Sequence, residues 1–253
     1  MKEPDRGRER GVRATITIGE ELMLLSLDDK SGVAKDGSSV GWTVAGGILA
    51  DLVLAGRVVV AEGRLTVTDP TPTGEPLLDE RLGRLAEWAE ETGKDRGRGK
   101  GKGNGDSSAK AADWLIQDHH TAVHAAVQRL CERGLVTEQR HRALGLFPVR
   151  RYPEADGTAE RELRERLAAV VLHGADPDPA TAALIALLHA ARLHHLAFPE
   201  LPRKQVEPRF AEIADRDWAG DSVREALRNV QAVFAAITAA TVATTTAAVT
   251  VVI

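Results

Sequence analysis

Three of the chain's eight histidines, His119, His120 and His124, lie close together and are the first candidates for chemistry. His120 and His124 are one helical turn apart, and neutral imidazole is a common zinc ligand. However, the residue after His120 is Thr121 rather than glutamate, no Cys-x-x-Cys pair occurs, and no third ligand stands at a recognisable spacing. We therefore favour core or surface histidines over a metal site, and predict neither a metal nor a cofactor.

Other motifs that would carry catalysis are missing from the sequence. The Gly-Lys repeats at 97–103 lack the GxxxxGK[ST] spacing of a phosphate-binding loop, and there is no GxSxG elbow. Cys131, the one cysteine, lies on the apolar side of a predicted helix, where inert packing is expected. His189, His194 and His195 lie in an apolar segment and are interpreted as core or surface residues. The sequence therefore predicts a protein that is not an enzyme.

Composition limits the class of protein further. A chain of 253 residues with 43% hydrophobic and 28% charged residues can bury a core, and only 4% are aromatic, which favours helices packed through Leu, Val and Ala. A single cysteine cannot form an internal disulfide, and the first residues lack the apolar stretch of a secretory signal, so we expect a cytoplasmic protein. The net charge of −4 argues against a protein built to coat nucleic acid.

Apolar periodicity predicts that most of the chain is helical. Thr17 and Glu20 have the spacing of a capping box, in which the hydroxyl and the carboxylate each accept a hydrogen bond from a free amide. Residues 42–55 repeat apolar side chains at helical spacing, and Gly56 can adopt the left-handed conformation that ends a helix. The Asp178-Pro179 pair marks another helix start, because aspartate can cap free amides and proline has none to satisfy.

We predict an all-α fold, a single helical domain of about eight or more helices with two small β-hairpins. Residues 1–13 are charged and lack apolar periodicity, so a flexible basic arm is expected before a domain spanning 14–253. Within that domain the Gly-rich, basic loop 93–110 has too little apolar surface to offset the entropy of ordering, and disorder is expected. Further helices are expected at 111–117, 121–133, 160–172, 179–195, 204–213 and 222–240, and hairpins at 57–68 and 136–152.

Several of these segments together resemble a known family. The landmarks are the runs 20–29, 49–57, 72–80, 130–136 and 184–191, which read EELMLLSLDD, LADLVLAGR, PTGEPLLDE, LCERGLV and LIALLHAA. In this order they are similar to the Golgi phosphoprotein 3 family over most of the chain, and we interpret the chain as a bacterial-type member. The resemblance implies a non-catalytic peripheral membrane adaptor that binds phosphatidylinositol 4-phosphate, has a protein cargo and forms a homo-oligomer.

In the eukaryotic family one Trp and three Arg residues build the phosphoinositide pocket. Alignment without gaps, anchored at Gly56 and Gly134, places those four positions at Asp36, Ala45, His120 and Val123, none of which is Trp or Arg. Trp42 is close enough to replace the aromatic residue if the loop is shifted. We therefore predict binding to anionic phospholipid head groups, with Trp42 and His120 as candidate contacts and with phosphatidylinositol 4-phosphate specificity in doubt.

Two further surfaces are candidates for membrane and protein contacts. Each basic residue near an anionic bilayer contributes about 1 kcal/mol, so the loop cations are candidate membrane contacts, although such runs also serve simply to keep a disordered segment solvated. The resemblance implies self-association through the second hairpin, which could instead fold back on its own domain. The membrane candidates are Arg96, Arg98, Lys100 and Lys102, and the oligomerisation candidates are Leu144, Leu146, Phe147 and Val149.

Two alternatives remain open from the sequence. The segment 121–133 followed by a basic hairpin has the outline of a DNA-binding winged helix, but residues 122–128 contain no Lys or Arg to contact phosphates or guanine, so nucleic acid is not the partner we expect. Residues 229–253 carry no charge and are long enough to span a membrane. Because they are mostly Ala, Thr and Val, we expect a buried helix to about Ala240 rather than an anchor.

Overall fold

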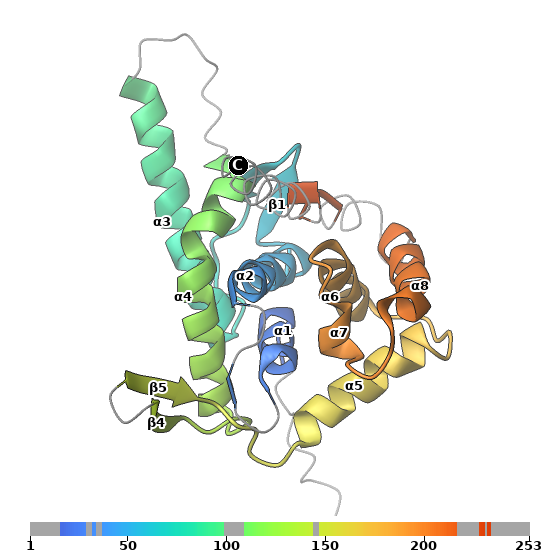
Figure 1. The fold of residues 1–253 in the computed structure, drawn as a ribbon. Coiled ribbons are helices and arrows are strands. Elements are labelled where there is room, and N and C mark those ends of the chain that lie inside the picture. The colour runs from blue at the N-terminus through green and yellow to red at the C-terminus, as the bar shows by residue number, and fades with distance from the viewer. Residues whose placement is uncertain are drawn as a thin grey trace, which may run out of the picture.

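The computed structural model describes residues 16–28, 32–33, 37–98, 109–143, 147–216, 228–230 and 232–233. Within these ranges the chain is mostly helical with two small antiparallel sheets, as predicted (Figure 1). The elements are α1 (Ile18–Ser26), α2 (Gly37–Leu54), β1 (Val58–Ala61), β2 (Arg64–Val67), α3 (Pro76–Arg98), β3 (Ala109–Lys110), α4 (Ala111–Glu132), β4 (Gln139–Ala143), β5 (Phe147–Arg151), α5 (Thr158–Val171), α6 (Pro179–Ala190), α7 (His194–Ala197) and α8 (Arg203–Asp215).

Helix α1 forms the centre of the fold, with α4 on one side and α5, α6 and α7 on the other (Figure 1). All nine of its residues are buried. The predicted capping box starts it: Glu20 N–H donates to Thr17 Oγ1 over 3.2 Å, and Thr17 N–H donates to Glu20 Oε2 over 2.8 Å. A short apolar helix, marginal in isolation, is thus stabilised by burial on every side.

Glycine brings α2 unusually close to α1. A Cβ atom on Gly47 would lie 2.7 Å from Leu22 Cδ1 and 3.0 Å from the backbone nitrogen of Gly19, distances that real Cβ atoms avoid. Gly47, which lowers the helix propensity of α2, therefore serves packing. At its end α2 closes with Arg57 N–H donating to Leu52 O over 2.9 Å, with Gly56 at φ 69°.

The first predicted hairpin is part of a larger sheet. Strands β1 and β2 pair antiparallel, with Val58 opposite Val67 and Ala61 opposite Arg64, and β3 adds a third strand on the far side of β2. The third strand was not predicted, because two residues at the end of a Gly-rich segment carry no period. The second hairpin, β4 and β5, lies where it was predicted.

Two helix predictions are corrected by the structure. The segments 111–117 and 121–133, predicted as separate helices, form the single helix α4. Asp118, in the polar run between them, is buried in an ion pair with Arg81 rather than exposed in a turn. The predicted helix 179–195 is instead α6 followed by the short α7. Helix α6 ends because Leu193 N–H donates to Leu188 O over 2.8 Å and Arg192 N–H donates to His189 O over 3.0 Å, with Arg192 at φ 59°.

Some predictions fall wholly or partly outside the described residues. The arm 1–13 lies there entirely, and of the loop 93–110 the backbone is helical to Arg98 and extended at Ala109–Lys110, so 99–108 are not described. Of the final predicted helix, 228–230 and 232–233 are helical, and Val230 and Val233 are buried. The predicted tail after Ala240 is outside the described residues.

Candidate lipid head-group site

The packing of α2 against α4 brings Trp42 next to His119. Their ring centroids are 5.7 Å apart, and both side chains are half-buried. Gly41 allows this approach, since a Cβ atom there would lie 3.3 Å from His119 Cδ2 and force the imidazole to move. The aromatic candidate from the sequence therefore lies against the histidine cluster of α4.

His119 in turn contacts His120, the second candidate. The two imidazole centroids are 3.9 Å apart and the rings are tilted by 37°. Nδ1 of His119 donates to the carbonyl oxygen of Ile116 over 2.6 Å, which leaves Nε2 of the neutral ring as an acceptor. His120 is exposed. We define the Trp42 face as Trp42, His119 and His120. From the sequence, His119 was a candidate only as a metal ligand. Its position between Trp42 and His120 depends on how α2 packs against α4.

The indole of Trp42 carries a donor with no acceptor among the described residues. Its Nε1 atom is buried, yet it forms no hydrogen bond there. A buried polar group without a partner is uncommon in folded proteins and calls for an explanation such as a ligand or a solvent molecule. The Trp42 face therefore combines an unused N–H donor with two imidazole rings.

A buried ion pair fixes the part of α4 that carries these histidines. Arg81 Nη1 on α3 donates to Asp118 Oδ1 over 2.8 Å, and both side chains are 3% exposed. Arg81 Nη2 also donates to the backbone oxygen of Thr121 over 3.1 Å. Burial raises the pKa of Asp118, and bonds from the Thr121 hydroxyl and from Arg81 act in the opposite direction. The pair binds α3 to the turn of α4 directly beside His119 and His120.

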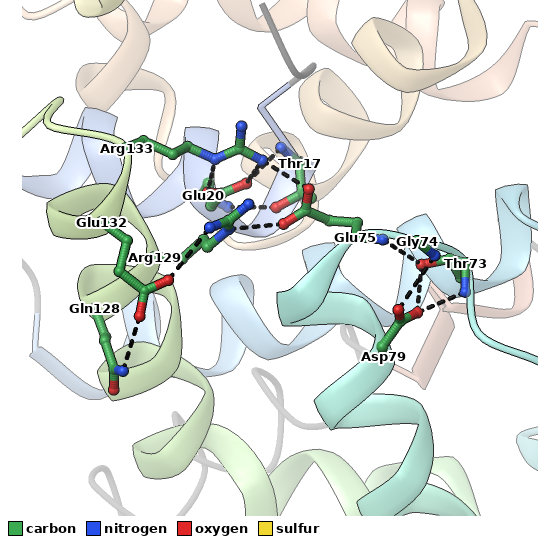
Figure 2. A network of polar contacts seen from close by, with 10 residues as sticks. All are labelled: Thr17, Glu20, Thr73, Gly74, Glu75, Asp79, Gln128, Arg129, Glu132 and Arg133. Carbon is green, nitrogen blue, oxygen red and sulfur yellow. Dashed lines mark hydrogen bonds and ion pairs between the residues drawn. The ribbon is translucent and has the colours of Figure 1, made fainter.

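A second ionic network holds the C-terminal end of α4 (Figure 2). Arg133 donates through Nε to Glu20 Oε1 over 2.7 Å and through Nη2 to Glu75 Oε2 over 2.9 Å. Arg129 Nε donates to the other oxygen of Glu75 over 2.9 Å. Glu20 is completely buried and Glu75 is 18% exposed. The network joins the first turn of α1, the turn before α3 and the end of α4, and no local sequence pattern predicted it.

The turn before α3 is itself held by a carboxylate. Asp79 Oδ1 accepts from the amide of Thr73 over 2.5 Å and from its hydroxyl over 2.7 Å, while Oδ2 accepts from Gly74 N over 3.2 Å (Figure 2). This turn directly precedes Pro76, the first residue of α3. Its role in presenting Glu75 to Arg129 and Arg133 is visible only in the structure.

The remaining positions aligned with the family's lipid pocket do not join the Trp42 face as charged groups. Ala45 is 2% exposed in the core, and Val123 is half-buried against it. Asp36 lies outside the described residues. Among the four aligned positions, His120 is thus the exposed polar side chain that the structure describes.

The other sequence candidates can be placed only in part. Arg96 and Arg98 belong to the helical backbone of α3, but their side chains are not described, and Lys100 and Lys102 lie outside the described residues. For the hairpin, Leu144 and Leu146 lie outside the described residues, and Phe147 and Val149 are described only as backbone in β5. These membrane and oligomerisation assignments remain predictions.

The histidine and cysteine candidates have defined surroundings. His124 is exposed, while His194 is 1% exposed and packs edge-on against Phe210. Within the described ranges, no group of three or more His, Cys, Asp or Glu side chains is arranged to hold a metal ion. Burial raises the pKa of the Cys131 thiol, which disfavours the reactive thiolate. In the same described part of the chain, no helix combines the length and apolarity needed to cross a bilayer.

Comparison with known proteins finds a related protein and a matching family. The chain is 34% identical over 87 residues to the vacuolar protein sorting-associated protein 74 of Eremothecium gossypii. That match covers 30% of this chain and 26% of the relative, so the aligned part spans about a quarter of the relative's length. The family model described as Golgi phosphoprotein 3 (GPP34) matches residues 18–230, which include every helix from α1 to α8. The chain therefore belongs to the Golgi phosphoprotein 3 (GPP34) family.

Proposed function

We propose that this protein is a non-catalytic peripheral membrane adaptor that binds anionic phospholipid head groups through the Trp42 face. The observation that carries the proposal is the buried indole N–H of Trp42, which has no acceptor among the described residues and lies beside the paired rings of His119 and His120. Family membership and the sorting function in the relative's name support it. Phosphate oxygens are strong acceptors for an N–H donor.

The Trp42 face suits a weakly specific head-group site. An indole and two imidazoles offer single N–H groups, whereas a guanidinium offers a planar fork that matches two phosphate oxygens at once. Indole rings also favour the interface between head groups and acyl chains. We therefore propose that the Trp42 face orients the protein on the membrane surface. The basic residues of the segment 96–102 add the electrostatic attraction, at about 1 kcal/mol for each charge near the bilayer.

The geometry does not favour the DNA-binding alternative. The helix that would enter the groove is the C-terminal half of α4, where Ala122 and Ala126 are fully buried in the core. This half of the helix is also held by Arg129 and Arg133 in the network with Glu75 and Glu20. We extend the adaptor proposal to a protein cargo and to self-association through β4 and β5, which the family resemblance implies.

Liposome co-sedimentation tests the proposal directly. Vesicles of phosphatidylcholine alone are compared with vesicles that also contain phosphatidylserine or phosphatidylinositol 4-phosphate, each at low and high salt. We expect wild-type protein to pellet with both anionic compositions and to be released as salt screens the attraction. Equal, negligible pelleting with every composition would overturn the membrane function.

Conservative variants separate the Trp42 face from general electrostatics. Trp42→Phe keeps an aromatic ring and removes the N–H donor, and His120→Gln changes an exposed residue, so neither should disturb the core. His124→Gln is the matched control, since it lies one turn further on α4 and is also exposed. We expect weaker pelleting for the first two and wild-type pelleting for the control. If all three variants behave alike, the site is misplaced, even when the membrane function holds.

A further inference from the structure

A cavity of about 480 Å³ is formed by α6, Arg192 after it, α8 and residues 228 and 232, none of which contributes to the Trp42 face. Its apolar lining is made of alanine, so the space exists because short side chains meet there. Its polar lining is made of charged or titratable side chains. The alanines are Ala186, Ala190, Ala214 and Ala232, and the polar residues are His189, Arg192, Arg203, Glu207, Asp215 and Arg228.

Positive charge exceeds negative charge around this cavity. Glu207 is already paired with Arg203 one turn away on α8. Arg228 donates to the backbone oxygen of Asp215 over 3.3 Å rather than to its carboxylate. Among the described residues, neither Arg192 nor Arg228 has a carboxylate partner. The described lining thus has three guanidinium groups against two carboxylates, a net of one positive charge, which favours an anionic ligand.

The backbone of Arg192 has a conformation that usually favours glycine. Arg192 ends α6 in the left-handed conformation, at φ 59°. The equivalent residues that end α2 and α4, Gly56 and Gly134, are glycines at φ 69°, for which this conformation is free of strain. A side chain at such a position costs about 1 kcal/mol, and strain of this kind is concentrated at binding sites.

A pair of histidines lies behind the cavity. His189 Nδ1 is 3.0 Å from His194 Nε2. Burial, aided by the nearby charges of His189 and Arg203, lowers the pKa of His194 to about 4, so His194 is neutral near pH 7. One of the two rings donates the hydrogen bond between them, and when His189 gains a proton at lower pH both of its nitrogens become donors.

We propose that this cavity binds an oxyanion of the phosphomonoester class, with Arg192, Arg203 and Arg228 as its cationic contacts and His189 as a fourth donor. Guanidinium groups bind such oxygens in pairs of parallel hydrogen bonds. The volume holds a phosphorylated head group or a small phosphate ester. Burial and Arg203 lower the pKa of His189, Glu207 and Asp215 oppose this shift, and a bound anion would favour the imidazolium further.

Sulfate is the first probe, because its charge is constant over the range in which histidine titrates. Binding is followed by NMR shifts of His189 and Arg192 during titration at constant ionic strength, at pH 8 and at pH 6. We expect saturable shifts and tighter binding at pH 6, with the pH effect removed by His189→Gln. No saturable shift at either pH would overturn the proposal.

Arg192→Gly is the decisive variant, since it removes the guanidinium and also relieves the left-handed strain. Loss of binding therefore cannot be attributed to unfolding, and the melting temperature should be unchanged or raised. We expect sulfate binding to weaken by about tenfold or more, the loss of a charge-assisted hydrogen bond. Arg161→Gln, an exposed residue of α5 outside this cavity, makes the same charge change and should bind as wild type. Equal binding by Arg192→Gly and wild type would refute the assignment.

Two further binding measurements show whether the phosphate belongs to a soluble ester or to a lipid head group. Glycerol 3-phosphate presents the group in solution, and phosphatidylcholine vesicles with phosphatidic acid present the same group on a membrane. Binding of both that depends on Arg192 assigns the cavity to a lipid head group. Binding of glycerol 3-phosphate alone assigns it to a soluble ester, and either result supports the phosphomonoester class. The sulfate and glycerol 3-phosphate measurements involve no membrane, so a failure of the Trp42 face leaves this proposal testable.

Discussion

Replacing Arg133 with methionine should leave the buried carboxylate of Glu20 without its ion-pair partner. In the native protein Glu20 is completely buried and accepts from Arg133 Nε over 2.7 Å and from the amide of Thr17 over 2.8 Å (Figure 2). Methionine has a similar unbranched stem and no charge, so packing is largely preserved. What remains is a buried carboxylate with one backbone donor and no directly bonded counter-charge, since Arg129 acts on Glu20 only through space.

Burial sets the size of the expected loss. Breaking a buried ion pair by removing one partner costs about 3 to 5 kcal/mol, because the remaining charge is uncompensated. This is a large fraction of the about 5 to 15 kcal/mol that stabilises a typical domain. Arg129→Met removes the same charge one turn earlier, but its partner Glu75 is 18% exposed and keeps Arg133. We therefore expect Arg129→Met to cost about 1 kcal/mol or less.

Urea unfolding followed by circular dichroism at the helical band measures both losses. The unfolding midpoint of Arg133→Met should move to a lower urea concentration. The slope of the unfolding free energy against urea should be unchanged, because the same surface is exposed on unfolding. Adding Glu20→Gln to Arg133→Met removes the stranded charge, so the double variant should be more stable than Arg133→Met alone. Equal losses for Arg133→Met and Arg129→Met, or a double variant that is less stable still, would refute the reasoning.

Three other predictions use the same measurement. Gly47→Ala should destabilise by about 1 to 3 kcal/mol despite better helix propensity, because its Cβ overlaps α1, whereas Gly83→Ala, with open space around it, should stabilise by about 0.5 to 1 kcal/mol. Asp178→Ala should cost about 1 kcal/mol at neutral pH, because its carboxylate caps α6. Burial acts to raise the pKa of Asp178, but bonds from Thr181 lower it overall, so this difference should vanish as pH falls through that lowered pKa. The pKa of His194 is about 4 in the folded protein and about 6.5 in the unfolded chain. The free energy of unfolding should therefore decline by up to about 1.4 kcal/mol per pH unit as pH falls from 6.5 to 4, and His194→Gln should reduce this pH dependence.

The predictions that depended on neighbouring residues are confirmed. Thr17 and Glu20 form both bonds of the capping box, and Asp178 caps α6 with proline at its first position. These features are set by the backbone amides of one turn, which sequence spacing determines. The family landmarks extended the same local reasoning to the order of the helices, and for that reason the predicted helical fold agrees with the structure.

The predictions that failed required information from outside the local window. The end of α6 was missed because arginine, rather than glycine, takes the left-handed position. The continuity of α4 was missed because its polar middle contacts Trp42 and Arg81 rather than forming a turn. Arg133 and Glu20 are separated by 113 residues, and Arg166 and Glu21 by 145, so neither ion pair has a local signature. The Trp42 face is likewise a product of how α2 packs on α4.

The structure of the Trp42 face leads to an expectation about lipid selectivity. In the alignment without gaps, Ala45 and Val123 fall at two arginine positions of the family's pocket. Both are packed in or against the core and have no guanidinium fork for two phosphate oxygens. Single N–H donors discriminate head groups poorly, and the diffuse attraction of basic residues responds to charge density. On the proposed function, we therefore expect pelleting to follow the total anionic charge of the vesicle. Vesicles matched in surface charge, one set with phosphatidylserine and one with phosphatidylinositol 4-phosphate, should bind the protein equally. A clear preference for phosphatidylinositol 4-phosphate at matched charge, lost in Trp42→Phe, would contradict this expectation and show that these N–H donors alone achieve specificity.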